Sequence, residues 1–245
     1  MATKELTTIH DGVSLKGHLA WDERQQGRRP GVLVIHEAGG LGGHAKQRAE
    51  RIAQELGYAA YAMDLFGEVP ASMPDAMGWI TRLLRDPADL RGRLSGALRT
   101  LATQPEVHSG KLAAIGFCFG GTAAIELARS GADLKAIVGF HAGLRGTGAP
   151  DAAAIKAKIL ICNGAQDPFM TPEVFAAFTS AMIAAGADWQ VNLYGRARHS
   201  FTNVDADKLG MDAYAYNGEA DRRSWQAMRS LFAEVFDDEA GSAAG

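Results

Sequence analysis

Short apolar runs rich in β-branched and aromatic residues alternate with segments of helical periodicity through most of the chain. Glycine or polar residues bound each run, which is typical of buried strands. This alternation predicts an α/β fold, a mostly parallel sheet with helices on both faces, and ligands bind such sheets beyond the carboxyl ends of the strands. The predicted strands are 31–36, 58–63, 112–117, 136–140, 159–163 and 189–194, and the predicted helices are 44–56, 87–103, 119–130, 172–185 and 220–236.

The length and composition favour one domain. The chain has 245 residues, of which 47% are hydrophobic and 22% charged, enough to bury one sizeable core. No repeat or long linker interrupts it, so we predict a single domain over residues 1–236 and a flexible Gly/Ala/Ser-rich tail over residues 237–245. Amphipathic spacing in the last helix, at Trp225, Met228, Leu231, Phe232 and Val235, predicts that this helix docks on the core.

Charge and hydropathy exclude several classes of partner. The net charge is −3 and no run of basic residues occurs, which argues against a nucleic-acid partner. No stretch is apolar enough for a signal peptide or a membrane span, so we expect no membrane association and a cytoplasmic location. In that reducing compartment the two cysteines, Cys118 and Cys162, are not expected to form a disulfide. The sequence does not specify the oligomeric state, and it is compatible with a monomer.

A glycine-flanked cysteine follows the predicted strand 112–117 and runs directly into a predicted helix. The stretch Gly116-Phe117-Cys118-Phe119-Gly120-Gly121 has the form of a nucleophile elbow with cysteine in the serine position. The turn needs glycines where strand and helix approach each other, and the helix N-terminus favours thiolate over thiol. We therefore predict that Cys118 is the nucleophile and that the Phe119 N–H is an oxyanion donor. Cys162 lies inside an apolar strand and is expected to be inert.

An acid and a histidine follow the next strands in the order that an elbow fold requires. Asp167 comes after strand 159–163, and His199 comes after strand 189–194. Either residue alone is weak evidence, because aspartate is common in turns and the chain has seven histidines. Their placement after consecutive strands predicts a triad in the order nucleophile, acid, base.

The loop after strand 31–36 carries the sequence His36-Glu37-Ala38-Gly39-Gly40. This loop normally supplies the second oxyanion donor, for which the backbone at Ala38 is the candidate. Glu37 either accepts a proton from Cys118 or is a solvated loop charge.

The glycine loop also supports a rival function. Residues 40–45 fit the G-x-G-x-x-A form, and Asp64 closes the next strand, as in a dinucleotide fingerprint. The first matching glycine lies four positions beyond His36, however, rather than in a tight turn at the strand end. An NAD-binding oxidoreductase therefore remains an alternative, as does a hydrolase-like binding module without activity.

Taken together, Val34-Ile35-His36-Glu37, Gly-Phe-Cys-Phe-Gly-Gly, Gly-Ala-Gln-Asp-Pro and His-Ser-Phe resemble the dienelactone hydrolase family over nearly the whole chain. The resemblance implies an α/β-hydrolase fold. It also implies that the residue matching the nucleophile is Cys118, the base His199, the orienting acid Asp167 and the thiol-activating carboxylate Glu37.

The chain departs from the family where substrate is held. Enzymes that open the dienelactone ring hold its carboxylate with arginines, one of them shortly after the histidine, where this chain has Ser200-Phe201-Thr202-Asn203. Segment 64–90 is either a lid over the elbow or an ordinary amphipathic helix. The other candidates for the cleft are His141, which follows strand 136–140, and four arginines whose direction the sequence does not give: Arg82, Arg85, Arg196 and Arg198.

The sequence thus predicts a hydrolase of carboxylic esters or lactones of small molecules that uses a Cys-His-Asp triad, of the EC 3.1.1 type. It predicts no metal and no organic cofactor. The natural substrate is not specified, and dienelactone itself is not favoured.

Overall fold

The computed structural model describes residues 1–146 and 155–237, and its strands form one sheet. The eight strands follow the order β1-β2-β4-β3-β5-β6-β7-β8. Strands β1, β2 and β4 pair antiparallel, and every pairing from β4 to β8 is parallel. The prediction of a mostly parallel sheet is confirmed. The strands are β1 Ala2–His10, β2 Val13–Trp21, β3 Arg29–Ile35, β4 Ala59–Met63, β5 Val107–Phe117, β6 Ala136–Phe140, β7 Lys158–Gly164 and β8 Trp189–Tyr194.

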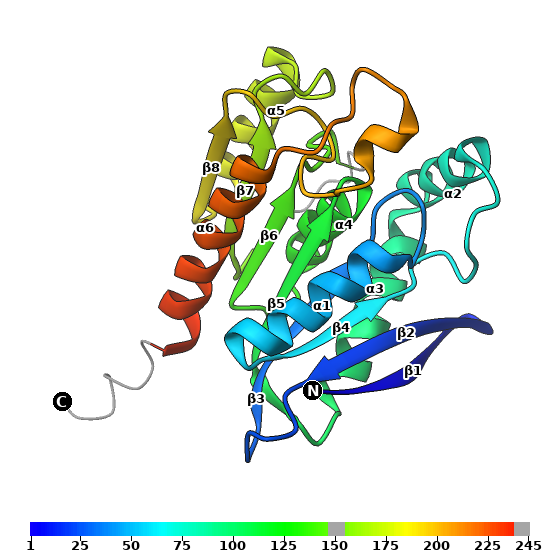
Figure 1. The fold of residues 1–245 in the computed structure, drawn as a ribbon, viewed down its shortest axis with the longest axis vertical. Coiled ribbons are helices and arrows are strands. Elements are labelled where there is room, and N and C mark those ends of the chain that lie inside the picture. The colour runs from blue at the N-terminus through cyan, green and yellow to red at the C-terminus, as the bar shows by residue number, and fades with distance from the viewer. Residues whose placement is uncertain (147–154, 238–245) are drawn as a thin grey trace.

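Helices cover both faces of the sheet (Figure 1). Helices α1 and α6 pack on one face in one buried cluster. Helices α2, α3, α4 and α5 pack on the other face in a second cluster. Because both faces are buried, the central strands read as nearly continuous apolar runs. The helices are α1 Gly43–Leu56, α2 Met73–Arg85, α3 Pro87–Ala102, α4 Phe119–Arg129, α5 Pro172–Ala184 and α6 Gly218–Asp237, with a short 3-10 helix at Ala206–Leu209.

The last helix docks as its amphipathic spacing predicts. Trp225, Met228 and Phe232 are buried, whereas Leu231 and Val235 are partly buried. The indole N–H of Trp225 donates to Glu55 of α1 at 2.8 Å, which ties α6 to its neighbour on the same face. The predicted tail begins at residue 237, which the structure places as the last residue of α6. The rest of the predicted tail, residues 238–245, lies outside the described residues.

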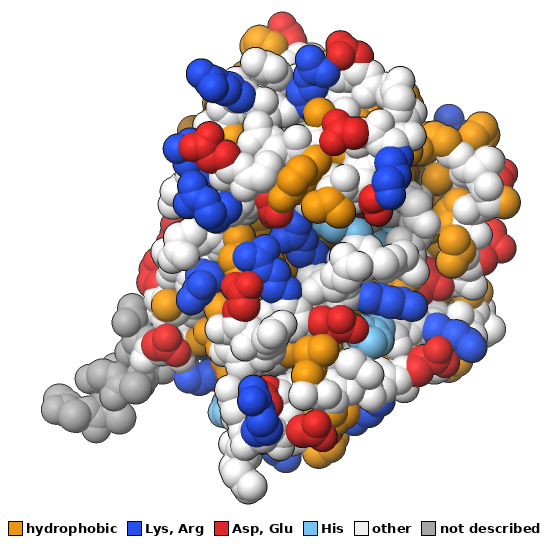
Figure 2. Space-filling model, viewed as in Figure 1, with side chains coloured by type: hydrophobic (Ala, Val, Ile, Leu, Met, Phe, Trp, Pro, Cys, Tyr) orange, Lys and Arg blue, Asp and Glu red, His pale blue; other side chains and the backbone are white. Residues whose placement is uncertain are grey.

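The sheet topology brings five predicted site residues to one edge. Glu37, Cys118, His141, Asp167 and His199 follow β3, β5, β6, β7 and β8. These strands are neighbours and run parallel, so their carboxyl ends lie along one edge of the sheet (Figure 1). The face in Figure 2 carries basic and acidic side chains intermixed, without a continuous basic surface. Within the described residues, no helix combines the length and hydropathy needed to cross a bilayer.

Candidate active site

The turn between β5 and α4 places Cys118 in a strained conformation. Its φ is 53° and its ψ is −117°, and α4 begins at the next residue. A Cβ on Gly116 would collide with the backbone of Gly120, so only glycine allows strand and helix to approach this closely. The turn leaves Cys118 half-buried and holds it at the helix N-terminus, where amide groups lack intrahelical acceptors.

His199 and Asp167 form a buried pair. The Nδ1 atom of His199 lies 2.6 Å from Oδ2 of Asp167, and both side chains are almost fully buried. The other carboxylate oxygen of Asp167 accepts the backbone N–H of Phe169 at 2.9 Å. The loop after β8 fixes the histidine backbone, because His199 exchanges hydrogen bonds with Ala213 and Ala215. Hydrogen bonds to both residues therefore hold the His199–Asp167 pair in place.

Three rings meet His199 edge-on. The centroids of Phe169, Tyr214 and His141 lie 5.0, 5.2 and 5.3 Å from its imidazole. Burial disfavours a charge on His199, but the negative charge of Cys118 and the hydrogen bond to Asp167 outweigh it and raise the pKa of His199 to about 10. A negative charge on Cys118 therefore favours the protonated form of His199.

The Glu37 carboxylate lies in the same polar region. Its Oε2 accepts from the Asn203 amide at 2.7 Å, and burial raises the pKa of Glu37 although Asn203 and His199 counteract it. Among the described residues, no hydrogen bond joins Glu37 to Cys118. Its backbone carbonyl accepts from Nδ1 of His36 at 2.6 Å, while Nε2 of His36 accepts the N–H of Leu65. His36 therefore fixes the loop that carries Glu37.

An apolar pocket of roughly 250 Å³ opens over the sulfur. Cys118 and His199 lie in its wall beside Phe119 and Ala38, the two predicted oxyanion residues. Helix α2, which belongs to the predicted segment 64–90, supplies one side of it. The remaining lining is mostly apolar, and the larger side chains are Met73, Met77, Ile80, Leu84, Leu144, Phe169 and Tyr214.

The arginines of the sequence prediction do not line this pocket, but another one does. Arg82 stacks on Trp79 at 4.9 Å, and Arg198 pairs with Asp212 at 2.6 Å. Neither these two nor Arg85 and Arg196 are among the lining residues, whereas Arg145 is. The arginine in the pocket wall thus follows β6, in a position that no motif marks.

Two further sequence interpretations can be compared with the structure. His141 does not line the pocket over Cys118 and is a buried, hydrogen-bonded residue instead. Asp64, the acidic residue of the dinucleotide fingerprint, binds the backbone N–H groups of Phe66 and Gly67 at 2.9 and 3.0 Å. Its carboxylate therefore closes a turn, which weakens the NAD-binding alternative.

Cys162 is fully buried, and burial raises the pKa of its thiol to about 12, as expected of an inert cysteine.

The sequence analysis did not identify four residues around the site, which are Arg145, Phe169, Asn203 and Tyr214. All lie in loops after β6, β7 or β8, so their position beyond strand ends is the one signal that points to them. The described residues contain no group of three or more His, Cys, Asp or Glu side chains arranged to hold a metal ion.

Comparison with known proteins gives matches over nearly the whole chain. The model of the dienelactone hydrolase family matches residues 15–236. A Yersinia pestis protein named "Putative carboxymethylenebutenolidase" is 28% identical, with 94% of this chain and 87% of that protein covered.

Two solved structures are more similar still, and both have a TM-score of 0.91. One, titled m3DLH, is 46% identical and covers 96% of this chain and 98% of its own. The other, described as the dienelactone hydrolase-like promiscuous phosphotriesterase P91 from metagenomic libraries, is 42% identical with the same coverage.

Proposed function

Because this chain belongs to the dienelactone hydrolase family of α/β-hydrolases, we propose that it hydrolyses carboxylic esters or lactones of small molecules through Cys118, His199 and Asp167. One observation carries the proposal. The buried His199–Asp167 pair, 2.6 Å apart, stands beside a half-buried cysteine in the wall of an apolar pocket. A protein that only binds its ligand needs no such pair.

In the proposed acylation step, the Cys118 sulfur attacks the substrate carbonyl carbon. The carbonyl electron pair moves onto oxygen, and the N–H groups of Phe119 and Ala38 stabilise the oxyanion. When the intermediate collapses, the leaving alkoxide takes a proton from His199. An alcohol departs, or the ring of a lactone opens, and a thioester remains on Cys118.

Deacylation follows from the loss of charge on sulfur. A negative charge on the Cys118 sulfur helps to raise the pKa of His199. The thioester sulfur carries no charge, so its formation lowers this pKa again. Neutral His199 then accepts a proton from water, and the resulting hydroxide attacks the thioester. Collapse releases the carboxylic acid and restores the sulfur anion and the protonated histidine. Asp167 holds the ring and stabilises its charged form in both steps.

The pocket lining favours uncharged, hydrophobic acyl groups. Helix α2 contributes Met73 and Met77, whose flexible side chains adapt to different shapes. We further propose that α2 acts as a lid over this pocket. The phosphotriesterase named above makes aryl phosphotriesters a second candidate class. There the same sulfur attacks phosphorus, the P–O bond to the aryl group breaks, the phenol leaves with the His199 proton, and water then hydrolyses the S–P bond. We further propose a cytoplasmic location, since both cysteines are free thiols, the state that a reducing compartment maintains, and catalysis without a metal or organic cofactor.

Turnover and thiol labelling together test the proposed function. Aryl esters, thioesters, lactones and an aryl phosphotriester are offered to the enzyme, and activity is followed during treatment with iodoacetamide. We expect hydrolysis of at least the aryl esters. We also expect that loss of activity parallels labelling of Cys118 while Cys162 stays unlabelled, because the Cys162 thiol is buried. Labelling of Cys162 first, or activity that survives full labelling of Cys118, contradicts the proposal. A folded chain that turns over none of the panel would favour a binding module.

We also propose that Glu37 assists activation of the thiol, and the substitution Glu37→Gln tests this. The amide keeps size and hydrogen bonding but lacks the basic oxygen, so acylation and alkylation should slow near neutral pH. The loss should shrink as pH rises, because the thiol then ionises without help. Stopped-flow kinetics from about pH 6 to about pH 10 measures the ratio of the acylation rate of wild type to that of Glu37→Gln. A ratio that stays constant across this range would indicate a packing defect instead.

A further inference from the structure

His141 has no part in the steps above, yet it lies between the nucleophile and the loop that carries the base. The residue follows β6, is fully buried and has a positive φ of 38°. Its Nδ1 accepts the backbone N–H of Cys118 at 3.1 Å. The same N–H also donates to the carbonyl of Phe140 at 3.0 Å, so the bond has two acceptors.

The partner of Nδ1 fixes the protonation of this imidazole. A backbone N–H can only donate, so Nδ1 is unprotonated and Nε2 carries the proton. Nε2 donates to the Thr202 hydroxyl at 2.8 Å. Burial and then the positive charges of His199 and Arg48 hold the pKa of His141 well below its usual value, so the ring is neutral. The Glu37 carboxylate, 3.8 Å from Nε2, is the acidic group that faces it.

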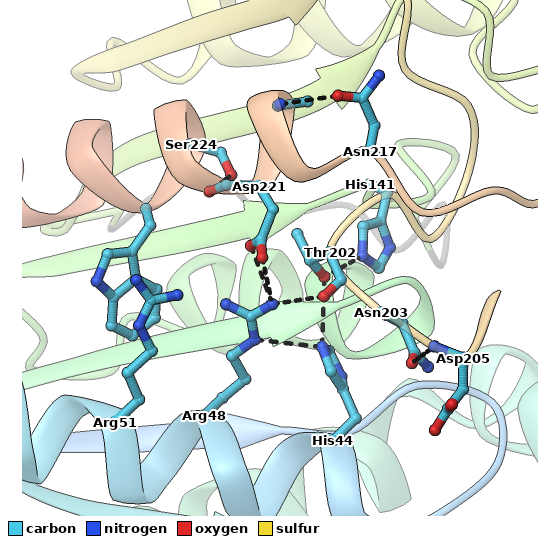
Figure 3. Close-up of polar contacts among 12 residues, drawn as sticks. His44, Arg48, Arg51, His141, Thr202, Asn203, Asp205, Asn217, Asp221 and Ser224 are labelled. Atoms are coloured by element: carbon cyan, nitrogen blue, oxygen red, sulfur yellow. Dashed lines mark hydrogen bonds and ion pairs between the residues drawn. The ribbon is translucent and has the colours of Figure 1, made fainter.

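Thr202 lies three residues after His199 in the same loop, and this loop is anchored to two helices (Figure 3). Arg48 of α1 donates through Nη2 to the Thr202 carbonyl and to Asp221 of α6, the latter at 3.0 Å. The Thr202 hydroxyl also lies 3.4 Å from Nε2 of His44. The hydroxyl that accepts the hydrogen bond from His141 is therefore itself held in place.

We propose that His141 is a positioning residue that holds the strained backbone of Cys118 in place for catalysis, while its bond to Thr202 orients the ring. It links the backbone of the nucleophile to the loop of the base through one neutral ring. Cys118, with its φ of 53°, needs such a link, because strained backbone persists only where the surroundings hold it. The inference rests on the proposed function of Cys118.

Two amide substitutions separate the two ends of this link. In His141→Asn the side-chain oxygen replaces Nδ1 as the acceptor for Cys118, whereas in His141→Gln the amide reaches Thr202 instead. We expect His141→Asn to keep kcat per titrated thiol within about 5-fold of wild type, and His141→Gln to lose about 100-fold, since a displacement near 1 Å has effects of this size. KM should change little in either variant.

Stability needs a separate control, because asparagine tolerates positive φ better than glutamine. Leu101→Ala removes a buried side chain that lies beside Gly31, at the opposite end of β3 from the site, and should lower Tm without changing kcat. Equal kcat values for the two His141 variants, or losses that follow Tm among all three variants, would overturn the positioning role. If Cys118→Ala still hydrolyses the ester, the proposed function fails. If Cys118→Ala is inactive but His141→Asn and His141→Gln have equal kcat values, only this inference fails.

Discussion

Replacing Cys118 with alanine is expected to remove ester hydrolysis almost completely while the fold stays intact. In the proposed mechanism the sulfur forms the bond to substrate, so no other residue of the site takes over its role. Loss of such a nucleophile typically lowers kcat by a factor on the order of 10⁴ to 10⁶. Steady-state kinetics on an aryl ester, with circular dichroism to monitor the fold, measures the effect.

Cys162→Ala provides the matched control for this variant. Cys162 is buried in β7 and lies outside the catalytic pocket, so its loss should affect stability more than turnover. The result that conflicts with our account is substantial activity in folded Cys118→Ala protein, which would move the nucleophile elsewhere.

Substitution of the base or the acid is expected to have the next largest effect. His199→Ala should nearly abolish turnover of an unactivated ester, and Asp167→Asn should lower kcat/KM by about 10³- to 10⁴-fold. Asp167 is one of the groups that raise the pKa of His199, so its replacement should also lower the pH at which this histidine loses its proton. The pH dependence of kcat/KM for wild type and Asp167→Asn measures this shift.

His18→Ala is the control for the histidine. His18 also pairs with a carboxylate, Glu50, at 2.9 Å, but it lies on β2, away from the strand ends that form the site. This variant should retain wild-type activity. In a double variant with Cys118→Ala, the His199 substitution should add almost nothing, because coupled residues act as a unit. Independent, multiplying effects would argue against the triad.

The parallel part of the sheet could be predicted from the sequence because its strands are buried on both faces. The apolar runs at residues 136–140 and 189–194 coincide with β6 and β8 exactly as bounded in the structure. The first two strands were not predicted. They lie at the exposed antiparallel edge, where apolar and polar residues alternate, and the Asp11-Gly12 turn between them, with φ values of 47° and 76°, is the signal that marks the hairpin.

The candidate site could be predicted from the sequence only where chain order carries the information. Cys118, Asp167 and His199 follow their strands in the order of a known motif, and the structure places His199 against Asp167. The residues around them depend on how distant loops fold back. Tyr214 reaches the His199 ring from fifteen residues further along the chain, and Arg145 enters the pocket wall from the loop after β6. No local spacing encodes such contacts.

The most direct test of the account is mass spectrometry of an acyl-enzyme trapped in the His199→Ala variant. A 4-nitrophenyl ester acylates without help from an acid, whereas deacylation needs His199, so the intermediate should accumulate. After acid quench and peptic digestion, we predict one acyl group, removed by neutral hydroxylamine, on the peptide that contains Cys118. An acyl group on another residue, such as Ser200, or turnover of the wild-type enzyme without any adduct on Cys118, would contradict the proposed mechanism.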